Sequence, residues 1–165
     1  MASTSTNKQP LLIDRVLNNV ISLDGAVIGS TTGYAVGGTN SAKLLVDCIN
    51  NNRDGALIED LFTISMAASG TTKVLFYLST AADYLRSTEG VFVGDITPNA
   101  TAGAYQAVAA LPKVLAPVPQ VGNDPKNQAL YIPGGKALWV ALQTTVANAP
   151  AAGSAPVVGA QGGFF

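Results

Sequence analysis

Short apolar runs separated by turn residues follow one another along most of this chain. The runs at residues 42–49, 56–67, 73–79 and 136–145 have the length and composition of strands, and the third is almost wholly apolar, as in a central strand. Shorter strands are predicted at residues 25–28, 34–36, 90–96, 129–132 and 157–158. Within 56–67 the alternation slips near Leu61 and Phe62, which indicates a β-bulge.

Gly, Pro, Asn and Asp mark the boundaries of these runs. Segment 50–55 ends in a pair suited to a left-handed turn, and residues 133–135, Pro-Gly-Gly, predict a tight turn. Residues 105–121 hold three prolines, which lack the ladder donor, so they predict an edge strand or an extended crossing. One helical turn is predicted at residues 80–89, with Ser79 or Thr80 as its N-cap.

The whole pattern amounts to about eight strands with almost no helix, which predicts an all-β protein. An antiparallel β-sandwich or a jelly roll is the expected architecture. We divide the chain into an N-terminal arm, residues 1–24, and a β-sandwich body, residues 25–165.

The arm is polar over its first nine residues and then apolar without a clean period. Its β-branched residues and paired asparagines favour an extended conformation over a helix. Five of its side chains are too apolar for a free tail: Leu11, Leu12, Ile13, Val16 and Leu17. They either form the first strand of the body or pair with the edge of another subunit by strand addition, and we favour the second alternative.

Charge is scarce in this chain of 165 residues. Only 12% of the residues are charged, 48% are hydrophobic, and the formal net charge is −1. An average soluble domain has roughly 25% charged residues, so we expect neighbouring subunits to cover part of the surface. The alternative is a neutral domain kept soluble by its Ser, Thr, Asn and Gln residues.

The distribution of charge and apolar residues argues against two classes of partner. Lys and Arg are scattered singly, so direct binding to nucleic acid is not expected. No stretch approaches the ~20 apolar residues that span a bilayer, and the N-terminus has no signal-peptide h-region, so no membrane partner is expected.

Candidate chemistry is sparse, and we predict no enzyme, cofactor or metal site. The chain has no histidine, which removes the commonest general base and metal ligand. Cys48, the single cysteine, lies in an apolar run and is expected to be buried and inert. Glu59 and Asp60 are adjacent in a predicted strand and therefore point to opposite faces, which leaves a two-carboxylate hydrolase as a remote alternative.

Aromatic side chains allow two interpretations. Five of them could form a carbohydrate-binding platform, but their place in apolar strand runs favours core packing: Phe76, Tyr77, Phe92, Tyr131 and Trp139. Phe164 and Phe165 follow two glycines at the end of the sequence. We expect this pair to fill a groove, either on its own subunit or on a neighbour.

Several segments resemble small virion proteins of tailed bacteriophages. The resemblance rests on residues 56–61, 70–78 and 130–141 and on the ending 160–164, and it covers about residues 55–165. Such proteins are β-sandwiches whose last hairpin carries a Pro-Gly turn, and they often end in Gly-Gly, an acidic residue and an aromatic residue. Phe164 stands here in the place of the acidic residue.

The resemblance implies a structural component of a virion, synthesised in the host cytoplasm. A capsid cement (decoration) protein fits the arm and body best, and the resemblance implies a homotrimer that binds neighbouring copies of the major capsid protein. A tail, neck, baseplate or fibre component is the alternative, as is a carbohydrate-binding module for host recognition. The interaction residues expected in all the structural roles are the five apolar arm residues and the terminal phenylalanines.

Overall fold

The computed structural model describes residues 15–28, 42–50, 54–66, 73–85, 89–99, 101–108, 130–143, 150 and 153–165. Nine strands lie within these residues: β1 (Arg15–Ser22), β2 (Lys43–Asp47), β3 (Gly55–Ile64), β4 (Lys73–Ser79), β5 (Val91–Ile96), β6 (Tyr105–Ala107), β7 (Leu130–Pro133), β8 (Ala137–Gln143) and β9 (Val157–Phe164). The strand predicted at residues 34–36 and most of the proline-rich segment 105–121 lie outside the described residues.

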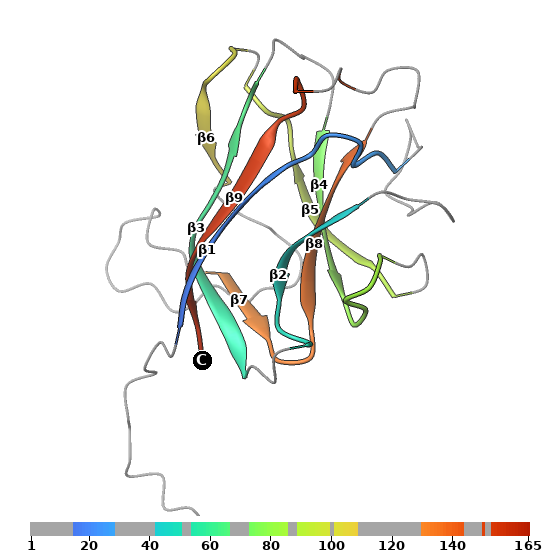
Figure 1. Ribbon diagram of the computed structural model, residues 1–165, viewed down its shortest axis with the longest axis vertical. Helices are drawn as coiled ribbons and strands as arrows, with labels where there is room; N and C mark the ends of the chain where they lie inside the picture. The colour runs from blue at the N-terminus through green and yellow to red at the C-terminus, as the bar shows by residue number, and fades with distance from the viewer. Residues whose placement is uncertain are drawn as a thin grey trace, which may run out of the picture.

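The strands form two sheets that face each other (Figure 1). In the sheet that we call sheet A, the order is β1-β9-β3, and β6 and β7 pair with different parts of β3. In sheet B the order is β2-β8-β4-β5. All pairings between these strands are antiparallel. The prediction of an all-β antiparallel sandwich is therefore confirmed.

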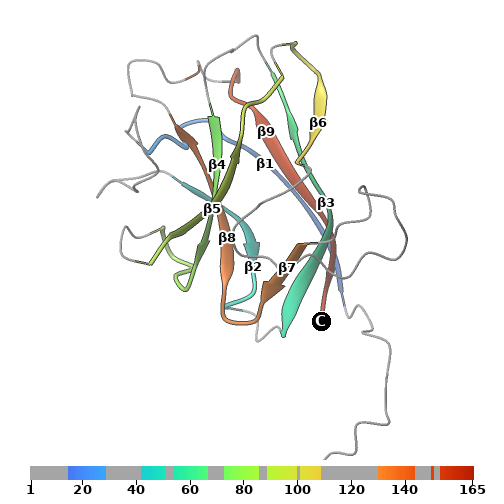
Figure 2. The same ribbon diagram turned by 180° about the vertical axis from the view of Figure 1, so that it is seen from behind.

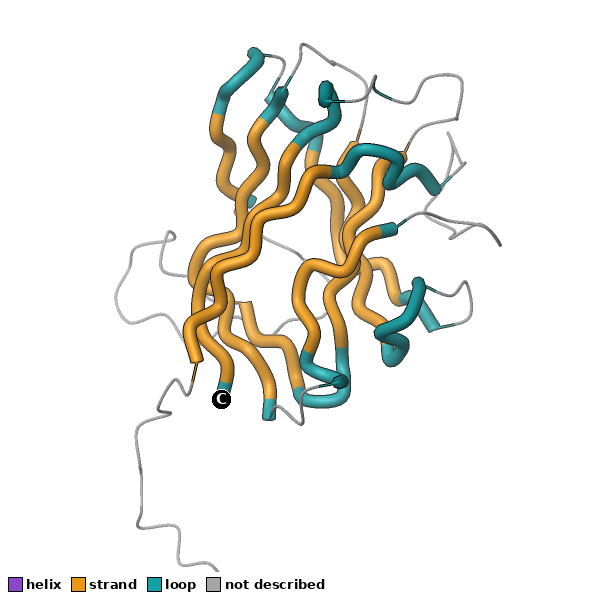
Figure 3. The backbone as a smooth tube through the Cα atoms, in the orientation of Figure 1, coloured by secondary structure: helices purple, strands orange, loops and turns teal. Residues whose placement is uncertain are grey.

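The two sheets are seen from the opposite side in Figure 2, where β5 lies in front. The backbone tube in Figure 3 has no helix among the described residues. The predicted helical turn at residues 80–89 is wrong over its described part, since residues 80–85 form bends and a loop. Ser79 accepts a hydrogen bond from the Ala81 N–H at 3.0 Å, so the hydroxyl stabilises a local turn instead of capping a helix. Among the described residues, none forms a helix long and apolar enough to cross a membrane.

A bulge interrupts the pairing of β3 with β9, and it lies close to the place where the sequence predicts one. The register shifts between Ile58 and Asp60, two to three residues before the predicted slip. Gly162 lies opposite Ile58 and has a φ of +157°, and a Cβ there would overlap the carbonyl oxygen of Leu57. Only glycine therefore allows the two strands to approach this closely.

The main core lies between the sheets. Alternate residues of each strand point inward, and both sheets contribute large apolar side chains that are at most 1% exposed, such as Ile58, Phe76 and Leu138. Cys48 belongs to this core and is 1% exposed, as the sequence predicts.

Sheet B has a second apolar cluster on its outer face. Trp139, Tyr77 and Leu75 project from that face, and two loop segments cover them with Ile28 and Leu85. The buried indole N–H of Trp139 donates to the carbonyl of Ala81 at 2.9 Å, so the covering loop also satisfies the polar atom of the tryptophan. Strands β4 and β8 are thus buried on both faces, which explains their almost continuous apolar sequences.

After β1 the chain crosses from sheet A to sheet B. Ala26 and Ile28 form backbone hydrogen bonds with Leu142 of β8, so the strand predicted at residues 25–28 is a short bridge beside β8. The Asp24 carboxylate lies at this corner and accepts hydrogen bonds from the N–H groups of Gly153 and Ala155. These bonds, that of Gly153 above all, lower the pKa of Asp24.

Candidate interaction surface

Residues 15–22 of the predicted arm are a strand of the sandwich itself. They form β1, which pairs over its whole length with β9 of the same chain, from Arg15 opposite Phe164 to Ser22 opposite Val157. For these residues the structure therefore has the first strand of the body, which is one of the two alternatives left open by the sequence. The edge of β1 that pairs with β9 is not used for the favoured pairing with another subunit. Leu11, Leu12 and Ile13 lie outside the described residues.

The two described arm residues among the predicted contacts point in opposite directions. Leu17 is 4% exposed and belongs to the core between the sheets, whereas Val16 is 76% exposed. Alternation along a strand explains the difference, because successive side chains point to opposite faces of a sheet. Val20 points the same way as Val16 and is 52% exposed. The sequence predicted Val16 as a contact residue but passed over Val20.

Phe164 and Phe165 both pack against residues of their own subunit. Phe164 is the last residue of β9, is 9% exposed and packs in the main core. Phe165 follows, and its ring lies 6.4 Å from that of Tyr131 at an angle of 42°. Of the two alternatives for this pair, the structure has packing on the own subunit.

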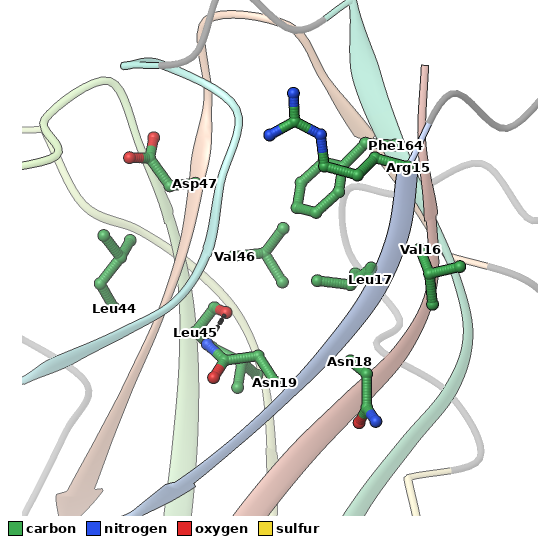
Figure 4. A pocket seen from close by; sticks show the side chains of 10 residues that line it. All are labelled: Arg15, Val16, Leu17, Asn18, Asn19, Leu44, Leu45, Val46, Asp47 and Phe164. Atoms are coloured by element: carbon green, nitrogen blue, oxygen red, sulfur yellow. Dashed lines mark hydrogen bonds between the residues drawn. The ribbon is translucent and has the colours of Figure 1, made fainter.

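A groove runs between β1 and β2, the edge strands of the two sheets on one side of the sandwich. It holds about 350 Å³, and its lining includes the side chains of Leu17, Val46 and Phe164, which face one another across the opening (Figure 4). At one end the strands are joined, because the Asn19 amide donates to the Leu45 carbonyl at 2.7 Å. At the same end the Lys43 ammonium donates to the Ser22 carbonyl at 2.8 Å.

The outer face of sheet A has three transverse rows of side chains across β1, β9 and β3. The register of the strands gives two apolar rows, Val16–Gly163–Leu57 and Val20–Gly159–Phe62, and a polar row between them, Asn18–Gln161–Asp60. We call these nine residues the sheet A face. Both apolar rows have glycine on the central strand, so the two valines of β1 have no side chain beside them on β9.

Phe62 lies over one of these glycines. A Cβ at Gly159 would overlap the Phe62 ring, so the ring occupies the space that a side chain on β9 would take. Tyr105 from β6 covers the other side of Phe62, with the two ring centroids 5.3 Å apart. This packing leaves Phe62 only 7% exposed although it belongs to neither of the two core clusters.

The Tyr105 hydroxyl points to the polar row and lies 2.9 Å from both carboxylate oxygens of Asp60. Partial desolvation raises the pKa of Tyr105 first of all, and the hydrogen bond to Asp60 and its negative charge raise it further. The tyrosine thus remains a neutral donor to the Asp60 carboxylate at neutral pH.

The five aromatic residues considered as a carbohydrate platform do not come together on one surface. Phe76 is buried between the sheets, while Tyr77 and Trp139 are buried under the loops that cover sheet B. Phe92 packs partly buried against that second cluster. Tyr131 is the exposed member, at 38%, and it belongs to sheet A.

The described residues contain no group of three or more Cys, Asp or Glu side chains placed to hold a metal ion. Comparisons of the chain with protein-family models, with curated proteins and with solved structures found no match.

The sequence did not predict that Val20, Phe62, Tyr105 and the glycines of β9 belong to one surface. A signal was present, because Val16 and Val20 are four residues apart, as are Gly159 and Gly163. That spacing places each pair on one face of a strand. Which valine meets which glycine depends on the register of two strands at opposite ends of the sequence, and a local pattern does not contain it.

Proposed function

We propose that this protein is a structural component of a larger assembly and acts by binding through the sheet A face and the adjacent β1 edge. The observation that carries the proposal is that the outer faces of the two sheets differ in how far loops cover their apolar side chains. Loops close the outer face of sheet B over Trp139 and Tyr77, whereas Val16 and Val20 of sheet A are 76% and 52% exposed. Neighbouring exposed apolar residues on a rigid sheet favour a protein contact.

The sheet A face also has the composition of an interface. It has a central polar row that can form hydrogen bonds, flanked by valine, leucine and phenylalanine, with Tyr105 and Tyr131 on the neighbouring strands. Tyrosine is enriched at protein interfaces because its large ring is apolar and its hydroxyl can find a partner. The strands hold these side chains in place before binding, which lowers the ordering cost of association.

The finer proposal is a virion component, most simply a capsid cement protein that binds neighbouring capsid subunits. It is supported by the resemblance of residues 55–165 to small phage virion proteins and by the charge-poor composition. A tail, neck or baseplate role would use the same surface. The burial of the aromatic residues argues against the carbohydrate-binding alternative, because four of its five platform residues pack in or against the buried clusters.

Labelling of particles tests this proposal. Antibodies against the purified chain are applied to particles isolated on a density gradient from the organism that carries the gene, and the label is located by electron microscopy. Label spread over the shell is expected for a cement protein, whereas label confined to one vertex or to the tail would move the protein to a neck, tail or baseplate position. Absence of the chain from the particles, with all of it in the soluble fraction, would contradict a virion role.

Variants of the sheet A face test whether this surface is responsible for association with particles. The double variant Val16→Lys/Val20→Lys is expected to fold and to lose its association with particles, because it places two charges on the proposed contact. Val91→Lys is the matched control, since Val91 is 56% exposed on β5 of the other sheet. Equal loss of binding in both variants would show that the sheet A face has no special role.

A further inference from the structure

Strand β1 has one edge that no described strand covers. Its other edge pairs with β9. The Leu23 N–H donates to the Pro156 carbonyl at 3.0 Å, so residues 23 and 156 form a hydrogen-bonded pair that continues the β1–β9 register. In an antiparallel ladder such pairs alternate. Residues 17, 19 and 21 therefore direct their backbone groups to β9, and Val16, Asn18 and Val20 direct theirs away from it.

Within the described part of the chain, nothing pairs with these outward backbone groups. No hydrogen bond joins the backbone of Val16, Asn18 or Val20 to another described residue outside the ladder. The Ser22 carbonyl, two residues further along the same edge, accepts the Lys43 ammonium, which confirms the direction of the groups and marks where the free edge ends. The accessible edge therefore covers residues 15–20.

This edge lacks the features that usually protect a terminal strand. Proteins prevent edge-to-edge pairing with proline, a bulge or charged residues on the exposed strand. The β1–β9 register runs without a shift, and the sequence of β1 has no proline and a single charge, Arg15, at its beginning. Val16 and Val20 add two exposed apolar side chains on the same strand. The strand is therefore suited to receive another strand.

We infer that the free edge of β1 pairs with β1 of a second copy of this chain, antiparallel and centred on Asn18. The inference rests on the proposed function, because it names the partner and the register of a contact made by the same strand. In this register Asn18 lies opposite Asn18 of the second copy, and Val16 lies opposite its Val20. All of these residues direct their backbone groups to the shared edge, so the ladder is satisfied in both copies at once.

The pattern of exposed residues on β1 favours a second copy of this chain as the partner, in preference to a different protein. The exposed residues Val16, Asn18 and Val20 are symmetric about Asn18, apolar-polar-apolar, so the strand is complementary to itself. The pairing covers each exposed valine with the other valine of the second copy and places the two asparagine side chains side by side, where they can exchange hydrogen bonds. A two-fold contact uses the same patch on both subunits, as this one does.

The groove beside β1 leaves room for such a contact. β1 and β2 are edge strands on the same side of the sandwich, and they diverge from Asn19 toward Arg15 (Figure 4). The second copy therefore meets the Val16 end of β1 where β2 is farthest from it. The result is a sheet A that continues from one subunit into the next.

A cysteine crosslink tests the register. In the full chain, Asn18→Cys places the two new thiols at the two-fold axis with Cα atoms about 5.5 Å apart, which suits a disulfide. In Val16→Cys the two thiols are about 14 Å apart, because each lies opposite residue 20 of the other copy. Under mild oxidation we expect a covalent dimer from Asn18→Cys and none from Val16→Cys or the parent chain, whose Cys48 is buried.

Light scattering of the full chain tests the contact without a crosslink. We expect twice the chain mass of 16.8 kDa at high concentration, because a two-fold contact through one strand edge joins two copies and does not give the homotrimer that the resemblance implies. Asn18→Pro removes an N–H that β9 does not use, so it should leave the monomer folded and reduce the mass to that of one copy. Asn18→Ser keeps the N–H and should remain a dimer, and near-identical circular dichroism of the two variants shows that both are folded.

The outcomes separate this inference from the proposed function. A monomer at all concentrations, or an oligomer that Asn18→Pro leaves intact and Asn18→Cys does not crosslink, overturns the β1–β1 contact whether or not the chain is found on particles. A monomeric chain whose particle binding is lost in Asn18→Pro also overturns it, because the edge then takes a strand from another protein. A crosslinked dimer that is absent from virions supports the contact and contradicts the virion role.

Discussion

The outer faces of the two sheets differ in what covers them. On sheet B, two loop segments place Ile28 and Leu85 over Trp139 and Tyr77, so β4 and β8 are buried on both sides. On sheet A, β1 has an exposed residue at every second position of its central part, and β9 has glycine at two of its outer positions, Gly159 and Gly163, on either side of Gln161. The same sandwich thus covers one outer face with its own loops and leaves Val16 and Val20 exposed on the other.

Apolar residues on an outer face of the sandwich therefore contribute in one of two ways. Where loops of the same chain cover them, their burial stabilises the fold, by roughly 25 cal/mol per Å² of apolar surface removed from water. Where nothing in the described chain covers them, the same free energy is available for association. Substitutions on the two faces should therefore differ in which equilibrium they change.

The largest effect is expected for Trp139→Ala on sheet B. The change leaves a cavity under the covering loop and removes the hydrogen bond to the Ala81 carbonyl. We expect a loss of about 3–5 kcal/mol in the free energy of unfolding, measured by urea titration. Tyr131→Ala on sheet A is the control, and because Tyr131 is 38% exposed we expect less than about 2 kcal/mol. Equal losses would remove the distinction between the two faces.

A smaller effect is expected for Gly159→Ala on sheet A. The new methyl group overlaps the Phe62 ring, so we expect a loss of about 1–3 kcal/mol from overpacking. Adding Phe62→Leu should recover part of this loss, since the ring is the obstacle. A double-mutant cycle measures the coupling, which we expect to be at least about 0.5 kcal/mol. Strictly additive losses would mean that the ring does not lie over the glycine.

Tyr105→Phe should have a weaker effect that depends on pH. It removes the hydrogen bond to Asp60 on an exposed part of sheet A, so we expect a loss below about 1 kcal/mol at neutral pH. The pKa of Tyr105 is raised above 10.0 in the folded protein. Its contribution is therefore fully present below pH 10.0 and is lost as the pH rises through the folded pKa.

Unfolding titrations of the parent and of Tyr105→Phe at a series of alkaline pH values measure this difference. The two stability curves should converge as the pH rises above 10.0. A gap that stays constant across the series would show that the hydroxyl contributes nothing through its protonated form.

The smallest effect on stability is expected for Val16→Ser. Val16 is 76% exposed, so the change should alter the free energy of unfolding by no more than about 0.5 kcal/mol. The same substitution one residue later, Leu17→Ser, places a hydroxyl in the main core and should destabilise the protein by about 2–5 kcal/mol. Thermal unfolding of the two variants measures the difference. Similar losses of stability in Val16→Ser and Leu17→Ser would contradict the assignment of Val16 to the outer face and of Leu17 to the core.

Most of the fold could be predicted from local patterns. The apolar run at residues 73–79 is β4, the run at 136–145 contains β8, and the Pro-Gly-Gly turn is present, with Gly135 at a φ of +74°. Such features depend on neighbouring residues, which a sequence places side by side. The helical turn was predicted wrongly because Ala81 and Leu85 gain more from covering Trp139 than from a short helix.

The surface was harder to predict, because it depends on register. Arg15 meets Phe164, and Val20 meets Gly159, although these residues lie near opposite ends of the described chain. The sequence named Val16 and Leu17 as equivalent contacts, yet one is a surface residue and the other belongs to the core. Only the pairing partner of a strand decides which of two adjacent residues points inward.

The position of β9 has a consequence for synthesis on the ribosome. All strands of sheet B lie between residues 43 and 143, so that sheet can assemble while later residues are still being added. β9 lies between β1 and β3, so β1 lacks its partner strand, and β3 has only β6 and β7 beside it, until residues 157–164 have emerged. β1 thus waits for β9, and during that interval the nascent chain exposes β1 together with the edge of β3 that β9 later covers.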